Sequence, residues 1–295
     1  GIIIVLSLFL AYILSTILVK PLARVTKAIE DLTDGYQQDE ICVPDYTETE
    51  LITDAFNKML ARMKVLDESR SEFVSNVSHE LKTPMTSMKV LADSLVGQQG
   101  VPEELYQEFM HDITAEIDRE NRIITDLLTL VKMDKKNADL QIQHMSINQL
   151  LEDILKRLRP IADKRSIDLI LDSFRPVEAD VDELKFTSAI SNLVENAIKY
   201  NVDDGWVRVS LDADHKYFYV TVADSGMGIP EDSLSRIFER FYRVDKSHSR
   251  EIGGTGLGLA ITRSTIGMHH GVIKVFSKEG EGTTFSVRVP LSYIP

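Results

Sequence analysis

The sequence is poor in cysteine, and its basic residues are outnumbered by acidic ones. Its 295 residues include one cysteine, Cys42, so an internal disulfide and a thiolate metal cluster are excluded and a reducing compartment is expected. The formal net charge of -13 argues against a general binder of nucleic acid, because phosphate groups repel such a surface. A phosphate-bearing ligand must therefore be bound by local features of the chain.

The first 19 residues contain no charged side chain. As a helix they span about 28 Å, close to the thickness of a bilayer's hydrocarbon core. A signal peptide is the alternative, but no basic region precedes the run and no small-residue cleavage site follows it. Basic side chains do follow, at Lys20, Arg24 and Lys27. We therefore expect a transmembrane helix over residues 1–19 in the cell membrane, with residues 20–295 cytoplasmic. Because Gly1 already lies inside the apolar run, we also expect a missing N-terminal portion.

The next region has helical periodicity interrupted by two loops. Amphipathic helices are predicted over residues 21–34, 48–96 and 106–131. Two long helices with apolar stripes cannot bury those stripes in one hairpin, whereas two hairpins can bury them in a four-helix bundle. The pattern therefore predicts a homodimer.

His79 lies on the wrong side of its helix for a core residue. Val77 lies in the middle of the apolar stripe, and His79 lies about 200° around the helix from it. Thr83 lies one turn further along, on the same side as His79. Pro84 removes a backbone donor and is expected to bend the helix, which suggests a hinge. A solvated surface histidine is the simplest interpretation of His79 taken alone.

The pattern changes after a polar boundary at residues 135–143. Strands are predicted over residues 166–172, 206–214, 216–224, 271–278 and 282–291, and helices over residues 147–159, 184–200 and 256–268. Consecutive strands favour hairpins. We therefore expect an α/β sandwich with a largely antiparallel sheet rather than a doubly wound parallel fold.

Two segments of this region carry side chains suited to a nucleotide. Asn192 and Asn196 share one helix face with Lys199 a turn beyond, and amide oxygens suit Mg²⁺ while a lysine suits phosphates. Asp224 ends a strand before Gly226 and a second glycine, where a carboxylate can accept from an adenine amino group. Exposed polar residues on a helix and a simple turn are the respective alternatives.

A glycine-rich run, "GGTGLGLAI" at residues 253–261, opens a helix. Such a start offers unpaired amides and a positive dipole end to phosphate oxygens. The run follows a polar stretch instead of a strand, so a dinucleotide-binding fingerprint lacks its context and a lid over phosphates fits better. A last turn, "GEGTTF" at residues 280–285, leads into a strand.

In order and spacing, these segments and "IFERFYRVD" resemble the N, G1, F, G2 and G3 boxes of the histidine-kinase ATP-binding domain, of the GHKL or Bergerat type. "SHELKTPM" resembles that family's phosphoacceptor box, and "PLARVTKAI" with "AFNKM" resembles a HAMP relay domain, in which Glu50 replaces a usual glycine. The resemblance implies a membrane sensor histidine kinase of a two-component system. Its multidomain α and α/β architecture comprises a transmembrane helix (1–19), HAMP helices (20–66), a dimerisation and phosphotransfer domain (67–136) and a catalytic ATP-binding domain (137–295).

The resemblance also implies residue roles. His79 is the phosphoacceptor, Glu80 its base and Thr83 a helper in dephosphorylating a response regulator receiver domain. Asn196 is the Mg²⁺ ligand, and the residues expected to contact ATP are Asn192, Asn196, Lys199, Tyr200, Asp224, Gly226, Gly228, Arg243, Gly254, Thr255, Gly256, Leu257, Gly258 and Thr283. Neutral His79 then attacks the γ-phosphate of ATP, and the phosphoryl group passes to an aspartate of the regulator.

Two other classes of protein share parts of this pattern. Chaperone, topoisomerase and mismatch-repair ATPases use the same ATP-binding fold, but they lack an exposed histidine box on a dimerising hairpin. A scaffold that only binds ATP does not need His79, Glu80, Asn196 and Asp224 all intact. The sequence therefore favours a kinase, with ATP and Mg²⁺ as cofactors and no direct contact with nucleic acid.

Overall fold

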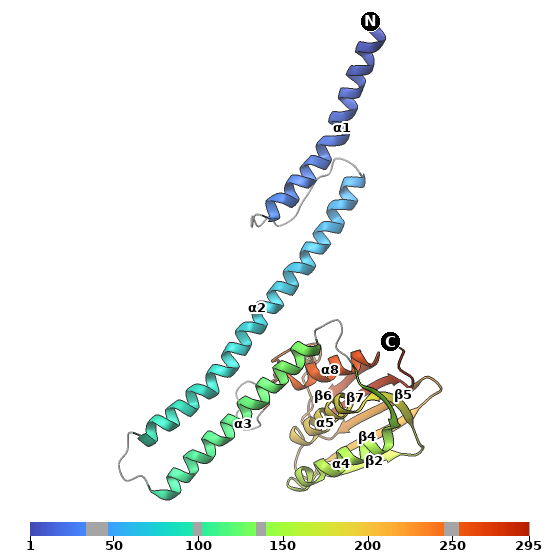
Figure 1. Cartoon of the computed structure of the whole chain (residues 1–295). Helices are drawn as coiled ribbons and strands as arrows, with labels where there is room; N and C mark the ends of the chain where they lie inside the picture. The colour runs from blue at the N-terminus through green and yellow to red at the C-terminus, as the bar shows by residue number, and fades with distance from the viewer. Residues whose placement is uncertain (34–46, 97–101, 134–139, 245–253, 295) are drawn as a thin grey trace. The chain divides into compact units, whose positions relative to one another are not determined.

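The chain is described here from a computed structural model, which covers residues 1–33, 47–96, 102–133, 140–244 and 254–294 (Figure 1). It divides into two compact units, residues 1–78 and 79–295. The expected connector with Gly35, Cys42 and Pro44 lies outside the described residues, as does Gly253 of the glycine-rich run.

The first unit is helical wherever it is described. Helix α1 spans Ile2–Thr33, so the two helices predicted on either side of Pro21 form one. Helix α2 spans Thr47–Val96 and runs on into the second unit. Most of the large apolar side chains from Ile2 to Leu14 are 53% to 85% exposed, whereas Ile13 is partly buried. Among the residues described, none of the helices combines the length and the hydropathy that a bilayer crossing requires.

The predicted helical hairpin is present as helices α2 and α3. Helix α2 continues without interruption through Pro84, and α3 spans Glu103–Met133 with two acidic residues in its first turn, where they stabilise the positive end of the helix dipole. Many apolar side chains of α3 remain exposed within one chain, among them Ile117 at 45% and Leu128 at 56%. The loop between the helices, residues 97–101, is outside the described part.

The C-terminal part of the chain is built on a five-stranded sheet in the order β2-β4-β5-β7-β6. The strands are β2 (Asp168–Ser173), β4 (Trp206–Ala213), β5 (Tyr217–Asp224), β6 (Val272–Lys278) and β7 (Gly282–Pro290). Among the strands that the structure describes, only β2 and β4 pair in parallel, so the prediction of a largely antiparallel sheet is confirmed. A separate antiparallel pair, β1 (Ile142–Ser146) and β3 (Glu178–Asp182), is not predicted from the sequence.

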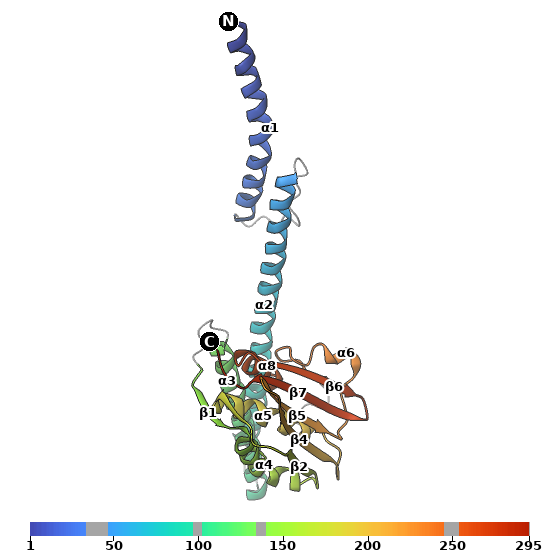
Figure 2. The same cartoon turned by 90° about the vertical axis from the view of Figure 1, so that its right-hand side faces the viewer.

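Three helices pack against one face of the five-stranded sheet (Figure 2). They are α4 (Ile147–Asp163), α5 (Glu183–Lys199) and α8 (Gly258–Met268), and a short α6 covers Glu231–Leu234. Helix α4 continues past Pro160, where the sequence predicts its end. Alternate residues of β5, such as Phe218, face the helices and are buried, and the Phe186 ring of α5 meets Phe218 edge to face at 5.6 Å.

Candidate functional site

Helix α5 carries three of the predicted nucleotide-binding side chains and begins at a strong cap. The Asp182 carboxylate accepts hydrogen bonds from the backbone amides of Lys185 at 3.0 Å and Gln141 at 2.9 Å, and from the Lys185 ammonium at 2.6 Å. Burial raises the pKa of Asp182, but these hydrogen bonds outweigh burial and leave the pKa below its usual value. The backbone amide of Asp182 donates to Nε2 of the buried His269 at 2.9 Å. The start of α5 is therefore joined to the end of α8.

Asn192 and Asn196 lie one turn apart on α5, and both are partly buried. The Asn192 amide nitrogen donates to the Thr262 hydroxyl of α8 at 3.0 Å. A Cβ atom at Gly258 would lie only 2.3 Å from the side-chain carbonyl oxygen of Asn192, so a larger residue there would displace the Asn192 side chain. Asn192 thus holds the two helices together, which leaves Asn196 as the better placed of the two to meet a metal ion.

A cluster of cations surrounds the end of α5. The Lys199 ammonium lies 5.0 Å from the centre of the Tyr200 ring, and a Cβ atom at Gly254 would come within 2.8 Å of that ammonium. Burial, together with the positive charges of Arg243 and of Arg122 and Arg119 on α3, lowers the pKa of Lys199 to about 8. Such a concentration of positive charge favours a bound anion.

Asp224 is the last residue of β5 and is 8% exposed. Its Oδ1 accepts from the backbone amides of Gly226 at 2.9 Å and Thr283 at 3.2 Å. Within the part of the chain that the structure describes, Oδ2 accepts no hydrogen bond. Burial raises the pKa of Asp224 to about 6, against the effect of the two amides. The site therefore holds a carboxylate that has spare acceptor capacity.

Close backbone approaches explain the two glycines after Asp224. A Cβ atom at Gly226 would lie 2.4 Å from the Tyr200 carbonyl oxygen. Gly228 has φ +71, a conformation that disfavours other residues, and a Cβ atom there would meet the Lys278 carbonyl oxygen at 2.1 Å. The end of α5, the turn after β5 and the end of β6 are thereby brought together.

The glycine-rich run is described over residues 254–261, and α8 begins within it at Gly258. Gly256 has φ +68 and accepts a hydrogen bond from the Phe241 amide at 2.9 Å. The Thr255 hydroxyl donates to Asp126 of α3 at 2.8 Å and accepts from the Leu257 amide at 3.2 Å. Leu257, predicted to contact ATP, has a fully buried side chain that packs with Leu130 of α3.

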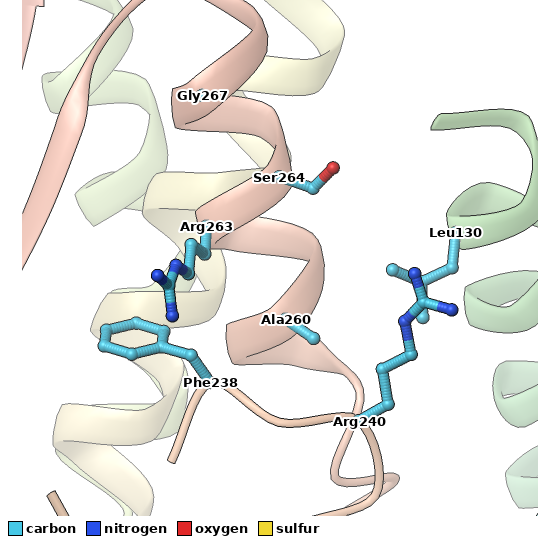
Figure 3. A pocket seen from close by; sticks show the side chains of 7 residues that line it. All are labelled: Leu130, Phe238, Arg240, Ala260, Arg263, Ser264 and Gly267. Atoms are coloured by element: carbon cyan, nitrogen blue, oxygen red, sulfur yellow. The ribbon is translucent and has the colours of Figure 1, made fainter. Parts of the chain in front are cut away.

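A cavity of about 480 Å³ is lined in part by Leu130 (Figure 3). Figure 3 shows Leu130 facing Ala260 across it, and the Arg263 guanidinium lies 5.4 Å from the centre of the Phe238 ring. The lining residues are Leu130, Phe238, Arg240, Ala260, Arg263, Ser264 and Gly267. None of them is a predicted nucleotide-binding residue, so this cavity is distinct from the candidate nucleotide site.

The predicted phosphoacceptor lies on α2. His79 is exposed, Glu80 is partly buried and Pro84 is buried. The Thr83 hydroxyl donates to the His79 carbonyl oxygen at 3.0 Å, which fixes it one turn beyond the histidine. Within the described residues, no hydrogen bond or ion pair joins His79 or Glu80 to the predicted nucleotide-binding residues. The sequence prediction of an exposed imidazole is confirmed.

The donor set agrees with a metal bound through amide and phosphate oxygens. Among the described residues, no group of three or more histidine, cysteine, aspartate or glutamate side chains could hold a metal ion. Mg²⁺ retains several waters and takes few protein ligands when it bridges phosphates. Asn196, beside the cationic end of α5, fits that kind of binding.

Two family models match separate parts of the chain. Residues 69–136 match the His Kinase A (phospho-acceptor) domain, and residues 181–293 match the histidine kinase-, DNA gyrase B-, and HSP90-like ATPase. The chain is 35% identical over 228 residues to the sensor histidine kinase WalK of Bacillus subtilis (strain 168), which covers 76% of this chain and 37% of the relative. The chain is homologous to sensor histidine kinases.

Further comparisons agree with this homology. A sensor protein kinase WalK of Staphylococcus aureus is 35% identical over 232 residues, which covers 78% of this chain and 55% of the relative. The chain thus spans about half or less of the length of these two relatives. A crystal structure of the histidine kinase ThkA in complex with response regulator protein TrrA has the same fold, with a TM-score of 0.63, 23% sequence identity and coverage of 84% of this chain and 68% of that one.

The sequence motifs of the ATPase domain do not include every residue that shapes the site. Asp182 could have been found, because an aspartate immediately before an apolar helical pattern is a common N-cap. Thr262 and His269 have no local signal, since their partners on α5 and β3 lie 70 and 87 residues away in the sequence.

Proposed function

We propose that this chain is the kinase portion of a sensor histidine kinase, which transfers the γ-phosphate of ATP to its own His79 and then to an aspartate of a response regulator. The observation that carries the proposal is the presence, on one chain, of an exposed histidine in the phosphoacceptor domain and a cationic cluster beside a buried carboxylate in the ATPase domain. A binding scaffold needs only the second of these features.

Asp224 recognises adenine in this proposal. Two backbone amides hold Oδ1 in place, and Oδ2 is the acceptor for the exocyclic amino group of the base. Gly226 and Gly228 let the backbone approach the ring, and Thr283 fixes the carboxylate from the opposite strand. The half-buried Tyr200 ring packs on the base.

The phosphates occupy the cationic end of α5. Lys199 and Arg243 neutralise their charge, and the amides of Gly254, Thr255, Gly256 and Gly258 face them from the start of α8. Asn196 would hold Mg²⁺, which would supply charge neutralisation to the phosphates. Asn192 and Leu257 act less directly, because the first ties α5 to α8 and the second anchors the run in an apolar cluster.

His79 is the nucleophile. A neutral ring nitrogen forms the nitrogen–phosphorus bond as the bond between the γ-phosphorus and the bridging oxygen of ADP breaks, and Glu80 orients the ring and accepts its proton. Transfer from phosphohistidine to a receiver aspartate follows, as expected for a relative of a kinase solved with a response regulator protein. The Thr83 hydroxyl positions water for hydrolysis of the regulator's phosphoaspartate, which releases inorganic phosphate.

The dimer and the membrane anchor complete the proposal. The exposed apolar side chains of α3 need a cover, and a second copy of the hairpin supplies it in a four-helix bundle. Residues 1–19 anchor the protein in the membrane and residues 20–66 relay the signal as a HAMP domain, on the strength of the uncharged run and the sequence motifs. The phosphotransfer domain occupies residues 67–136 and the ATP-binding domain residues 137–295.

Incubation with γ-labelled ATP tests the proposed reaction. The wild-type chain should acquire label that is labile in acid and stable in base, whereas His79→Gln should acquire none. His111→Gln is the matched control, because His111 is also an exposed histidine of the phosphoacceptor domain. ATP hydrolysis by a wild-type chain that never becomes labelled would instead indicate an ATP-driven clamp.

A further inference from the structure

Arg165 lies outside every sequence motif, in the turn between α4 and β2. Its Nη1 donates to the carbonyl oxygens of Ile198 and Lys199, both at 2.8 Å, and its Nη2 donates to the carbonyl oxygen of Asn201 at 2.8 Å. The last carbonyls of a helix lack partners within the helix and carry a partial negative charge. The guanidinium group therefore caps the end of α5 from another part of the fold.

Three further contacts of Arg165 lie beyond the helix. Nε and Nη2 both donate to Oδ1 of Asp203, at 3.3 Å and 3.1 Å, and the Arg165 carbonyl oxygen accepts from the Asp204 amide at 3.4 Å. A planar guanidinium can serve several acceptors at fixed angles, whereas a lysine ammonium acts as a point charge. Arginine is thus the side chain that suits this arrangement.

The segment that Arg165 holds is the one that faces the candidate nucleotide site. The Tyr200 carbonyl oxygen accepts from the Met227 amide at 3.1 Å, in the turn after Asp224. The buried Asn201 side chain donates to the Trp206 carbonyl oxygen at 3.0 Å and accepts from the Ser225 hydroxyl at 3.1 Å. The backbone from Lys199 to Asn201 is therefore fixed between Arg165 on one side and the Asp224 turn on the other.

We propose that Arg165 is a positioning residue of the nucleotide site, which sets Lys199 and Tyr200 relative to Asp224 without touching the nucleotide. This inference rests on the proposed binding of ATP. An exposed ion pair contributes little to folding, and Asp203 is 79% exposed. The hydrogen bonds to the three carbonyl oxygens are therefore the important contacts of Arg165, and they fix the geometry of the nucleotide site.

Arg165→Lys tests the inference, because it keeps the charge and removes the planar fork. We expect an about tenfold weaker binding of a fluorescent ATP analogue to the full chain, since each hydrogen bond contributes on the order of 1 kcal/mol. The melting temperature is measured in parallel. Arg175→Lys is the matched control, because Arg175 also pairs with an exposed aspartate, Asp212, but lies between β2 and β3; its nucleotide affinity should equal that of the wild type.

Chemical rescue separates positioning from a purely structural role. Added guanidinium ion at millimolar concentration should restore nucleotide affinity to Arg165→Ala and leave the Arg175→Lys control unchanged. Unchanged affinity in Arg165→Lys, with or without a lower melting temperature, would overturn the inference while wild-type binding of ATP upholds the proposed function. A wild-type chain that binds no ATP would instead refute the proposed function. If Arg165→Lys does not fold, Arg165→Gln replaces it; this variant keeps hydrogen-bond donors but removes both the charge and the planar fork.

Discussion

The ATPase domain and the phosphoacceptor helices bury their apolar side chains in different ways. Phe186 and Phe218 in the ATPase domain are completely buried by the domain's own helices and sheet. Met85 of α2 and Leu128 of α3 are 59% and 56% exposed within one chain. The ATPase domain thus buries its core by itself, whereas the phosphoacceptor helices leave apolar surface exposed, which we propose a second copy covers.

The largest effect is expected at Asp224, the residue that we propose binds adenine. Asp224→Asn replaces an acceptor by an amide, so the adenine amino group can lose its partner while the two backbone amides keep theirs. We expect about 100-fold weaker binding of ATP, because a hydrogen bond to a charged group contributes about 1.5–3 kcal/mol. Calorimetric titration with ATP measures the change.

Asp214→Asn is the control for that variant. Asp214 also accepts backbone hydrogen bonds, from Lys216 and Tyr217, but it lies in the hairpin between β4 and β5. Its loss should leave ATP affinity within about twofold of wild type. Equal losses in the two variants would show that Asp224 acts through general stability and not through the base.

The raised pKa of Asp224 predicts a pH dependence confined to this domain. ATP affinity should fall as the pH drops through about 6, because the protonated carboxyl loses acceptor capacity. The free energy of unfolding changes in the opposite direction. The pKa of Asp224 is higher in the folded state than in the unfolded state, so the stabilisation that Asp224 contributes is present below about pH 4 and is lost as the pH rises through 6. Denaturant unfolding and ATP titration between pH 5 and 8 check both trends, and Asp224→Asn should weaken both.

A change on the apolar surface of helix α3 should have little effect on ATP affinity and a large effect on dimer formation. Leu128→Glu places a charge on an apolar surface that the second copy covers, so the dimer should dissociate and labelling should fall, while ATP affinity stays unchanged. Asn121→Glu changes an exposed polar position of α3 and serves as the control. Sedimentation that shows a dimer for both variants would contradict the proposed bundle.

The smallest effect concerns the turn after His79. Thr83→Ala removes a hydroxyl that bonds to the His79 carbonyl oxygen and should leave autophosphorylation within about twofold of wild type. Dephosphorylation of a labelled response regulator should slow several-fold. Thr86→Ala removes an equivalent bond, from Thr86 to the Lys82 carbonyl oxygen at 2.8 Å, and should change neither activity. Equal loss of both activities in Thr83→Ala would refute the division of roles.

Local sequence patterns predict the main elements of both regions. The alternation of β5 and the apolar stripe of α5 give the five-stranded sheet and its helices correctly, because each element buries one face. The pair β1 and β3 is not predicted, since "IQHMS" and "EADVD" have little apolar alternation. Polar contacts help to hold β3 at its end, where Asp182 meets Gln141 and His269.

The residues of the candidate site also differ in whether a local sequence pattern predicts them. The positions of Asp224 and Thr283 follow from local motifs, and the structure brings them within a hydrogen bond of each other. The grip of Arg165 on the end of α5 could not be predicted, because it joins residues 33 to 38 positions apart through the packing of α4 and β2. The sequence motifs identify the side chains that face a ligand better than those that hold them in place.

The most direct test measures ATP affinity and phosphohistidine on the same samples. It shows whether the ATPase domain binds ATP while the phosphoacceptor helix accepts the phosphate. The account predicts that His79→Gln binds ATP as tightly as wild type and carries no label, whereas Asn196→Asp binds ATP more weakly and carries none. Mixed as heterodimers, the two chains should regain label if phosphate passes between subunits. Acid-labile, base-stable label on His79→Gln homodimers would contradict the account, because another residue would then be the acceptor.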